Sequence, residues 1–224
     1  MSTLTATPAV TSTGTDRARA AIVSSLLALG AITSAILVLW QPWGERDHLG
    51  YADLAPHRDA AWLGALADGL AIAAIGVALG IAVCRLAPSR GAIWANVGAV
   101  MTGIGGVAFC AGMVSFGAFA WYATNTDAIP VDTGTNLMTY AVDNPGHLLG
   151  IQMAGFLLTT LGSLVLMVAL WRARSVPRWL PIAYLVLTVG VFATDGVVLN
   201  VVQAIQMLTL VVVAFFAYRS TPEA

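Results

Sequence analysis

The sequence predicts an all-α polytopic integral membrane protein, a helical bundle of six transmembrane helices with both termini in the cytoplasm. Of its 224 residues, 58% are hydrophobic and only 9% are charged, whereas about a quarter of the residues in soluble domains are charged. Six apolar stretches approach or exceed the ~20 residues that cross a bilayer. No loop is long enough to form a core of its own, so we expect one membrane domain at 16–219 between two tails, 1–15 and 220–224.

The N-terminal part of the chain predicts two spans. Residues 1–15 are rich in Ser, Thr, Ala and Pro and have no apolar period, which is typical of a disordered tail. The apolar run at 20–40 is long for a signal peptide and no small-x-small cleavage site follows it, so we expect a retained first span. A polar loop at 41–59 then leads to a second span at 60–84.

The third predicted span, at about 91–122, contains no Asp, Glu, Lys or Arg. Four small or short side chains, Gly98, Thr102, Gly106 and Cys110, recur every fourth position and so form one ridge on a helix. Helices associate in lipid through such ridges, because small side chains let two backbones approach closely. We therefore expect this span to be the central helix of the bundle.

The C-terminal part of the chain predicts three more spans. Pro130 and the Asp-Asn-Pro-Gly sequence at 143–146 are turn signals, and Pro181 fits the first turn of a helix, where its missing N–H costs little. In order, the expected elements are a polar loop at 123–146, a fourth span at 147–171, a basic loop at 172–178, a fifth span at 179–194 and a sixth span at 197–218.

The arginines predict the orientation, because cytoplasmic loops carry an excess of basic residues. With the N-terminus inside, only Arg46 and Arg58 lie outside. The cytoplasmic arginines are then Arg17, Arg19, Arg85, Arg90, Arg172, Arg174, Arg178 and Arg219. The exclusive use of arginine is typical of a GC-rich bacterial genome, so we expect a multi-pass protein of the bacterial cytoplasmic (inner) membrane.

The last third of the chain resembles a known family. Residues 176–180, Val-Pro-Arg-Trp-Leu, precede the fifth span, and Asn200 lies early in the sixth. In these features residues 147–219 resemble an uncharacterised bacterial family of six-span membrane proteins. Its members often have a Glu in the last span, where this chain has Gln203 and Gln206. The resemblance implies the six-span fold and no established activity.

Composition excludes several classes of function. A chain without lysine forms neither a retinal or pyridoxal Schiff base nor a Walker-type phosphate loop, because each needs an amine. A net charge of -1 gives no general attraction to nucleic acid. Cys84 and Cys110 lie at different depths of two spans, so we expect no disulfide. The acidic and histidine residues of loop 41–59 lack metal-binding spacing, so we expect no metal and no cofactor.

Asp68 is the sharpest functional signal in the sequence. It follows the interfacial Trp62 by six residues, which places it ~9 Å into the hydrocarbon at the helical rise. A charge at this depth is costly, so we expect the neutral acid. Asp68 is a candidate catalytic acid, with Asp195 as a second candidate if the protein is an enzyme. The alternative is that Asp68 hydrogen-bonds a neighbouring helix and that Asp195 is an N-cap.

Other polar residues of the spans fall at depths similar to that of Asp68. The candidate ligand-binding residues are Ser115, His147, Gln152, Asn200 and Gln203. If the helix faces that carry these residues converge, the residues line an outward-facing polar pocket. The alternative for each residue is an interhelical hydrogen bond, worth about 0.6 kcal/mol.

Three functions are compatible with these residues. The leading hypothesis is a non-enzymatic membrane protein that binds a small amphipathic ligand in the pocket or supports a membrane protein partner. The second is an enzyme that uses Asp68 as a general acid on a polyprenyl or terpenoid substrate. The third is a proton-coupled transporter, which a single intramembrane acid supports less well.

Overall fold

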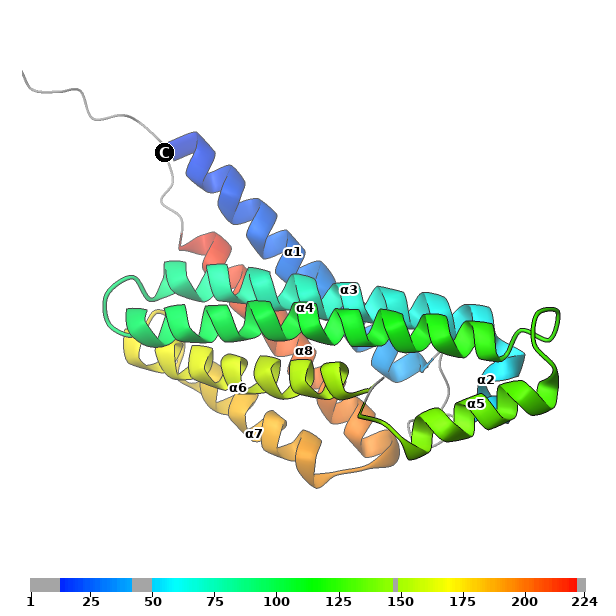
Figure 1. Cartoon of the computed structure of the whole chain (residues 1–224). Coiled ribbons are helices and arrows are strands. Elements are labelled where there is room, and N and C mark those ends of the chain that lie inside the picture. Colours follow the sequence, from blue (N-terminus) through cyan, green and yellow to red (C-terminus); the bar gives the residue numbers. More distant parts are fainter. Residues whose placement is uncertain (1–12, 42–49, 147–148, 221–224) are drawn as a thin grey trace, which may run out of the picture.

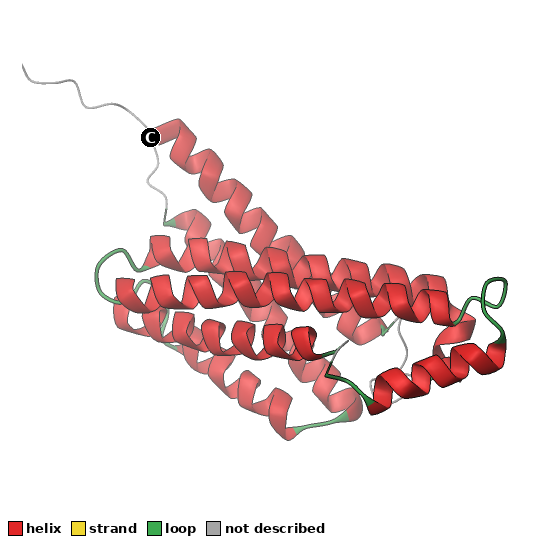
Figure 2. Ribbon diagram, in the orientation of Figure 1, coloured by secondary structure: helices red, strands yellow, loops and turns green. Residues whose placement is uncertain are grey.

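The computed structural model describes residues 13–41, 50–146 and 149–220, and all regular structure within them is helical (Figure 1, Figure 2). The predicted all-α class is therefore confirmed for the described residues. The helices are α1 (Thr13–Trp40), α2 (Tyr51–Leu54), the 3-10 helix η1 (Ala55–His57), α3 (Arg58–Leu86), α4 (Ala92–Ala123), α5 (Val131–Asp143), α6 (Gly150–Ala173), α7 (Trp179–Ala193) and α8 (Gly196–Arg219).

Five helical segments are long and apolar enough to cross a membrane. They are α1, the continuous segment Tyr51–Leu86, α4, α6 and α8, and α7 is a shorter apolar helix. The chain is therefore a multi-pass integral membrane protein. Most predicted bounds agree closely with these helices. The first does not, since α1 begins at Thr13 and so extends into the predicted tail, with an Arg19–Asp16 ion pair at 3.9 Å in its first turns.

The two ends of the bundle differ in their chemistry. The start of α1, the end of α8, and the turns between α3 and α4 and between α6 and α7 lie toward one end, whereas α2 and α5 lie at the other (Figure 1). We call the first the arginine end, because both turns carry arginines. We call the second the α5 end.

The segment predicted as a polar loop at 123–146 contains the helix α5, so that prediction was wrong. The turn signals flank this helix instead of filling the segment: Pro130 is its N-cap and Asn144 its C-cap. Gly134 and Met138, four residues apart, form its buried face. Such one-sided burial stabilises a short helix only when a partner surface is present. Here that surface is supplied by α2 and α4.

The central helix is α3, not α4 as the ridge of small residues predicted. Helix α3 packs against α1, α4, α6 and α8. Helix α4 packs mainly between α3 and α6, and its remaining face is exposed along Val100, Ile104 and Val107. Small residues allow close approach to a neighbour, but they do not say how many neighbours a helix has.

Glycines at seven-residue spacing hold α4 against α6. On α4, Gly98, Gly105 and Gly112 all face α6. A Cβ at Gly105 would lie 2.5 Å from the Thr159 amide nitrogen and 2.9 Å from the Gly155 carbonyl oxygen. No side chain fits between two backbones this close, so the two helices form a tight antiparallel pair.

Packing is dense toward the arginine end. Large side chains there are fully buried, including Leu79, Leu166, Leu170 and Leu210. A smaller cluster around Leu54 and Met138 lies toward the α5 end. The space between these two clusters contains the cavity described next.

A mostly apolar cavity as the candidate ligand site

A cavity of about 420 Å³ lies among the helices. This volume is within the range of small-molecule sites, which are about 300–1,000 Å³. Most of its walls are apolar or aromatic, from Val38, Trp62, Ile72, Phe109, Met113, Phe116, Trp121, Leu149, Met153, Phe156, Val191, Phe192 and Met207. The polar groups that line it come from α3, the C-terminal end of α4, α6, α7 and α8, and we describe them in three levels.

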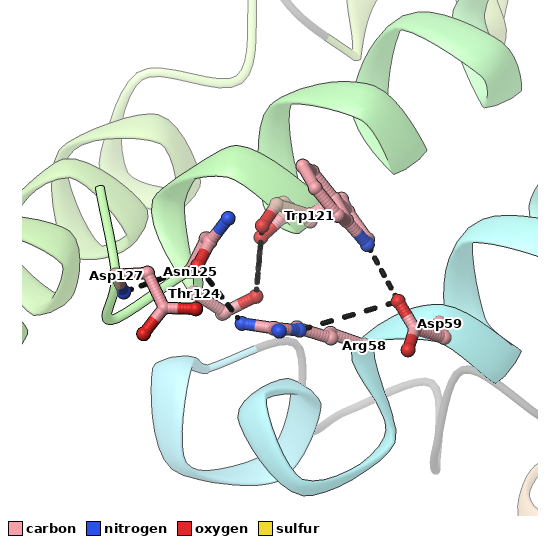
Figure 3. A network of polar contacts seen from close by, with 7 residues as sticks. Arg58, Asp59, Trp121, Thr124, Asn125 and Asp127 are labelled. Carbon is pink, nitrogen blue, oxygen red and sulfur yellow. Dashed lines mark hydrogen bonds and ion pairs between the residues drawn. The ribbon is translucent and has the colours of Figure 1, made fainter. Parts of the chain in front are cut away.

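The first level is the α5 end of the cavity, where Arg58 begins α3 with a side chain that is 30% exposed, and we call this level the mouth. Its Nη1 donates a hydrogen bond to the Asn125 Oδ1 at 3.1 Å, and its guanidinium lies 5.6 Å from the centre of the Trp121 ring (Figure 3). The Trp121 Nε1 donates to the Asp59 carboxylate at 2.7 Å, and Arg58 lies 4.0 Å from the same carboxylate (Figure 3). These contacts hold an arginine and an indole side by side at the cavity entrance.

The second level contains Asp68, which the sequence singled out. Its side chain is buried and lines the cavity. The Ser34 hydroxyl of α1 donates to the Asp68 Oδ1 at 2.8 Å. The expected interhelical hydrogen bond therefore exists, but with a residue that sequence reasoning missed. Serine in a span is common, and only the packing of α1 on α3 distinguishes Ser34 from the other serines.

Gln152 and Gln203, two of the residues predicted to bind a ligand, also line the cavity. The Gln152 Nε2 donates to the Met113 Sδ at 2.9 Å. Its Oε1 is buried and has no hydrogen-bond partner among the described residues. An amide oxygen in this state can accept a hydrogen bond from a bound molecule.

The third level is a polar floor that sequence reasoning largely missed. The Tyr184 hydroxyl donates to the Ser163 Oγ at 3.0 Å, and the Gln206 Nε2 donates to the Thr188 Oγ1 at 2.6 Å. The Thr188 hydroxyl donates in turn to the Tyr184 carbonyl oxygen at 2.8 Å. One feature of the sequence could have predicted this floor: Tyr184 and Thr188 are four residues apart and therefore lie on one face of an apolar span. The floor is neutral, and its donors pair with one another or with the backbone.

Three predicted site residues lie away from the cavity. Ser115 is exposed, because it lies on a face of α4 that points away from α3 and α6. Its hydroxyl donates a hydrogen bond to the Ala111 carbonyl oxygen of the same helix at 2.7 Å. Asn200 is buried but does not line the cavity. Asp195 is exposed at the N-cap of α8, without a side-chain cap hydrogen bond. Of the two candidate acids, only Asp68 lines the cavity. His147 lies outside the described residues.

Metal-binding residues do not cluster in the part of the chain that the structure describes. No group of three His, Cys, Asp or Glu side chains there could hold a metal ion. The described residues that line the cavity offer hydrogen-bonding groups, one cation at the mouth, one buried acid and extensive apolar contact.

A comparison with known protein families matches residues 17–220 to DUF4386, a domain of unknown function. The chain belongs to the DUF4386 family. The resemblance recognised at residues 147–219 is thus part of a match over nearly the whole length of this DUF4386 protein, and it confirms a family without an assigned activity. The comparisons with curated proteins and with solved structures gave no match.

Proposed function

We propose that this DUF4386 protein is a six-span protein of the bacterial cytoplasmic membrane, with both termini inside, and that its cavity binds a small amphipathic molecule. The observation that carries the proposal is the cavity itself: apolar walls, a cation at its mouth and a neutral polar floor. A purely structural bundle gains nothing from such a space, because unfilled volume costs stability. Helix α7 is the proposed fifth span, and its 15 residues give ~22 Å at the helical rise.

The orientation rests on the positive-inside rule, with the arginine end in the cytoplasm. A membrane-impermeant maleimide on intact cells should label Asn136→Cys on α5 and not Ser89→Cys in the turn after α3. Both positions are exposed, so lysis should make them equally reactive. Labelling of Ser89→Cys from outside would show that the orientation is inverted.

Filling the cavity should remove its ligand. Val191 on α7 lines the cavity, whereas Val189 on the same helix is 67% exposed and does not line it. Val191→Trp should reduce the amphiphile that co-purifies with the protein about tenfold, since overpacking costs about 1–3 kcal/mol. Extraction and mass spectrometry of the bound molecules measure this.

Val189→Trp is the matched control and should retain the wild-type amount. Equal ligand content in the two variants, or no bound amphiphile in the wild type after gentle purification, would contradict a ligand-binding function. Melting curves of both variants in the same detergent ensure that the comparison is made between folded proteins.

A further inference from the structure

We propose that the cavity selects amphiphiles with an anionic headgroup, a carboxylate or a phosphate monoester, which Arg58 binds at the mouth while the apolar chain extends toward the floor. This inference rests on the proposed function and adds the chemical class and the direction of the ligand. It follows from the placement of charge along the cavity.

The charged groups that the described residues contribute to the cavity lie at two positions. Arg58 and Asp68 are the only Asp, Glu, Lys, Arg or His residues among the described residues that line it. They are ten residues apart on α3, which is ~15 Å along the helix. The guanidinium is always protonated, so the mouth carries a permanent positive charge.

The contacts of Arg58 orient its guanidinium without neutralising it. Asn125 is an uncharged acceptor, and Trp121 offers only its ring face. The Asp59 carboxylate is at the 4.0 Å limit of an ion pair, is 76% exposed and already accepts the Trp121 N–H. Exposed ion pairs of this kind are weak. Arg58 can therefore present its planar fork of donors to an oxyanion, for which two parallel hydrogen bonds are especially favourable.

The rest of the cavity requires no second charge in the ligand. The Tyr184 and Thr188 hydroxyls and one N–H of the Gln206 amide already donate hydrogen bonds within the protein. Between the mouth and the floor, aromatic and aliphatic walls such as Phe116 and Phe156 dominate. A single-chain amphiphile with its head at Arg58 satisfies both regions, whereas a cationic amphiphile in the same position meets a like charge.

The test compares amphiphiles that share one chain and differ only in the head. Hexadecanoate, hexadecyl phosphate, hexadecan-1-ol and hexadecylamine are titrated against the full chain in amphipol, with displacement of fluorescent cis-parinarate as the readout. Both anions should bind wild type about ten- to a hundredfold more tightly than the alcohol, the range expected of a charge-assisted contact. The amine should bind most weakly, and inorganic phosphate alone should not displace the probe.

Arg58→Gln should reduce the preference for the anions over the alcohol to about twofold or less, because the charge-assisted contact is removed. Arg58→Lys should retain part of the preference, since it keeps the charge and loses the fork. The matched control is Arg90→Gln, which removes an exposed arginine at the opposite end and should behave as wild type.

Two outcomes would overturn the inference. Equal affinity of wild type for hexadecanoate and hexadecan-1-ol, or an anion preference that persists in a folded Arg58→Gln protein, would show that Arg58 is an interfacial arginine without a role in ligand choice. Either result leaves the cavity a ligand site. Absence of binding for all four amphiphiles is a different failure, because it would contradict the proposed function itself.

Discussion

Gly105→Leu is expected to separate α4 from α6 and to lower the free energy of unfolding by more than about 3 kcal/mol. A Cβ at this position would lie 2.5 Å from the Thr159 amide nitrogen and 2.9 Å from the Gly155 carbonyl oxygen. These are backbone atoms, which cannot rotate away as side chains do. The variant should melt at a much lower temperature in detergent, measured by loss of helical circular dichroism or by increased reactivity of the half-buried thiols of Cys84 and Cys110.

Gly103→Leu is the matched control for this experiment. It lies two residues earlier on α4, and a Cβ there would meet no atom within 4 Å. Its melting temperature should stay near that of the wild type, because the leucine enters open space on the same helix. Equal destabilisation by the two variants would contradict the close packing of α4 on α6. Gly91 is unsuitable as a tolerant control, since its φ is +100° and a Cβ there would lie 2.7 Å from the Ala169 carbonyl oxygen.

Asp68→Leu is expected to destabilise the protein by about 1–3 kcal/mol, the cost of leaving a buried polar partner unpaired. Ser34 is fully buried, and its hydroxyl donates to the Asp68 carboxyl at 2.8 Å. Asp68→Asn should cost much less, because the amide oxygen can still accept that hydrogen bond. Denaturant titration in mixed micelles measures both variants.

The double variant Ser34→Ala with Asp68→Leu completes the cycle. It should recover part of the loss, because removing both partners leaves no unpaired hydroxyl. Additive losses in the double variant would show that Ser34 and Asp68 are not coupled. The same proteins test the protonation state of Asp68 by infrared difference spectroscopy between wild type and Asp68→Asn.

We expect a protonated carboxyl stretch from Asp68 at pH 7 that the Asn variant lacks. Ionising a carboxyl group that is buried inside an apolar bundle is costly. An ionised carboxylate band in its place would show that water or a cation reaches this level. In that case the Asp68 side chain would be an ionised carboxylate in the cavity lining and not a neutral acid held by a hydrogen bond.

The sequence alone determined the membrane class, the approximate bounds of the long helices and the residues most costly to place in lipid. These features depend on composition and length, since about 20 apolar residues cross a bilayer whatever their neighbours are. Asp68, Gln152 and Gln203 were identifiable because strongly polar side chains are rare in apolar spans. Helix α5 was missed because its few apolar residues form a stable face only against α2 and α4.

The tertiary structure alone decided which faces of the helices meet. Ser115 and Gln152 looked equivalent in the sequence, yet Ser115 is exposed and Gln152 lines the cavity. In a soluble protein a polar outer face would indicate the rotation of each helix. In a bilayer the lipid is as apolar as the core, so hydrophobic periodicity does not distinguish a helix face that meets lipid from one that meets another helix. The pairing of Ser34 with Asp68, the central place of α3 and the polar floor around Tyr184 therefore depend on packing between backbones, which a single sequence does not display.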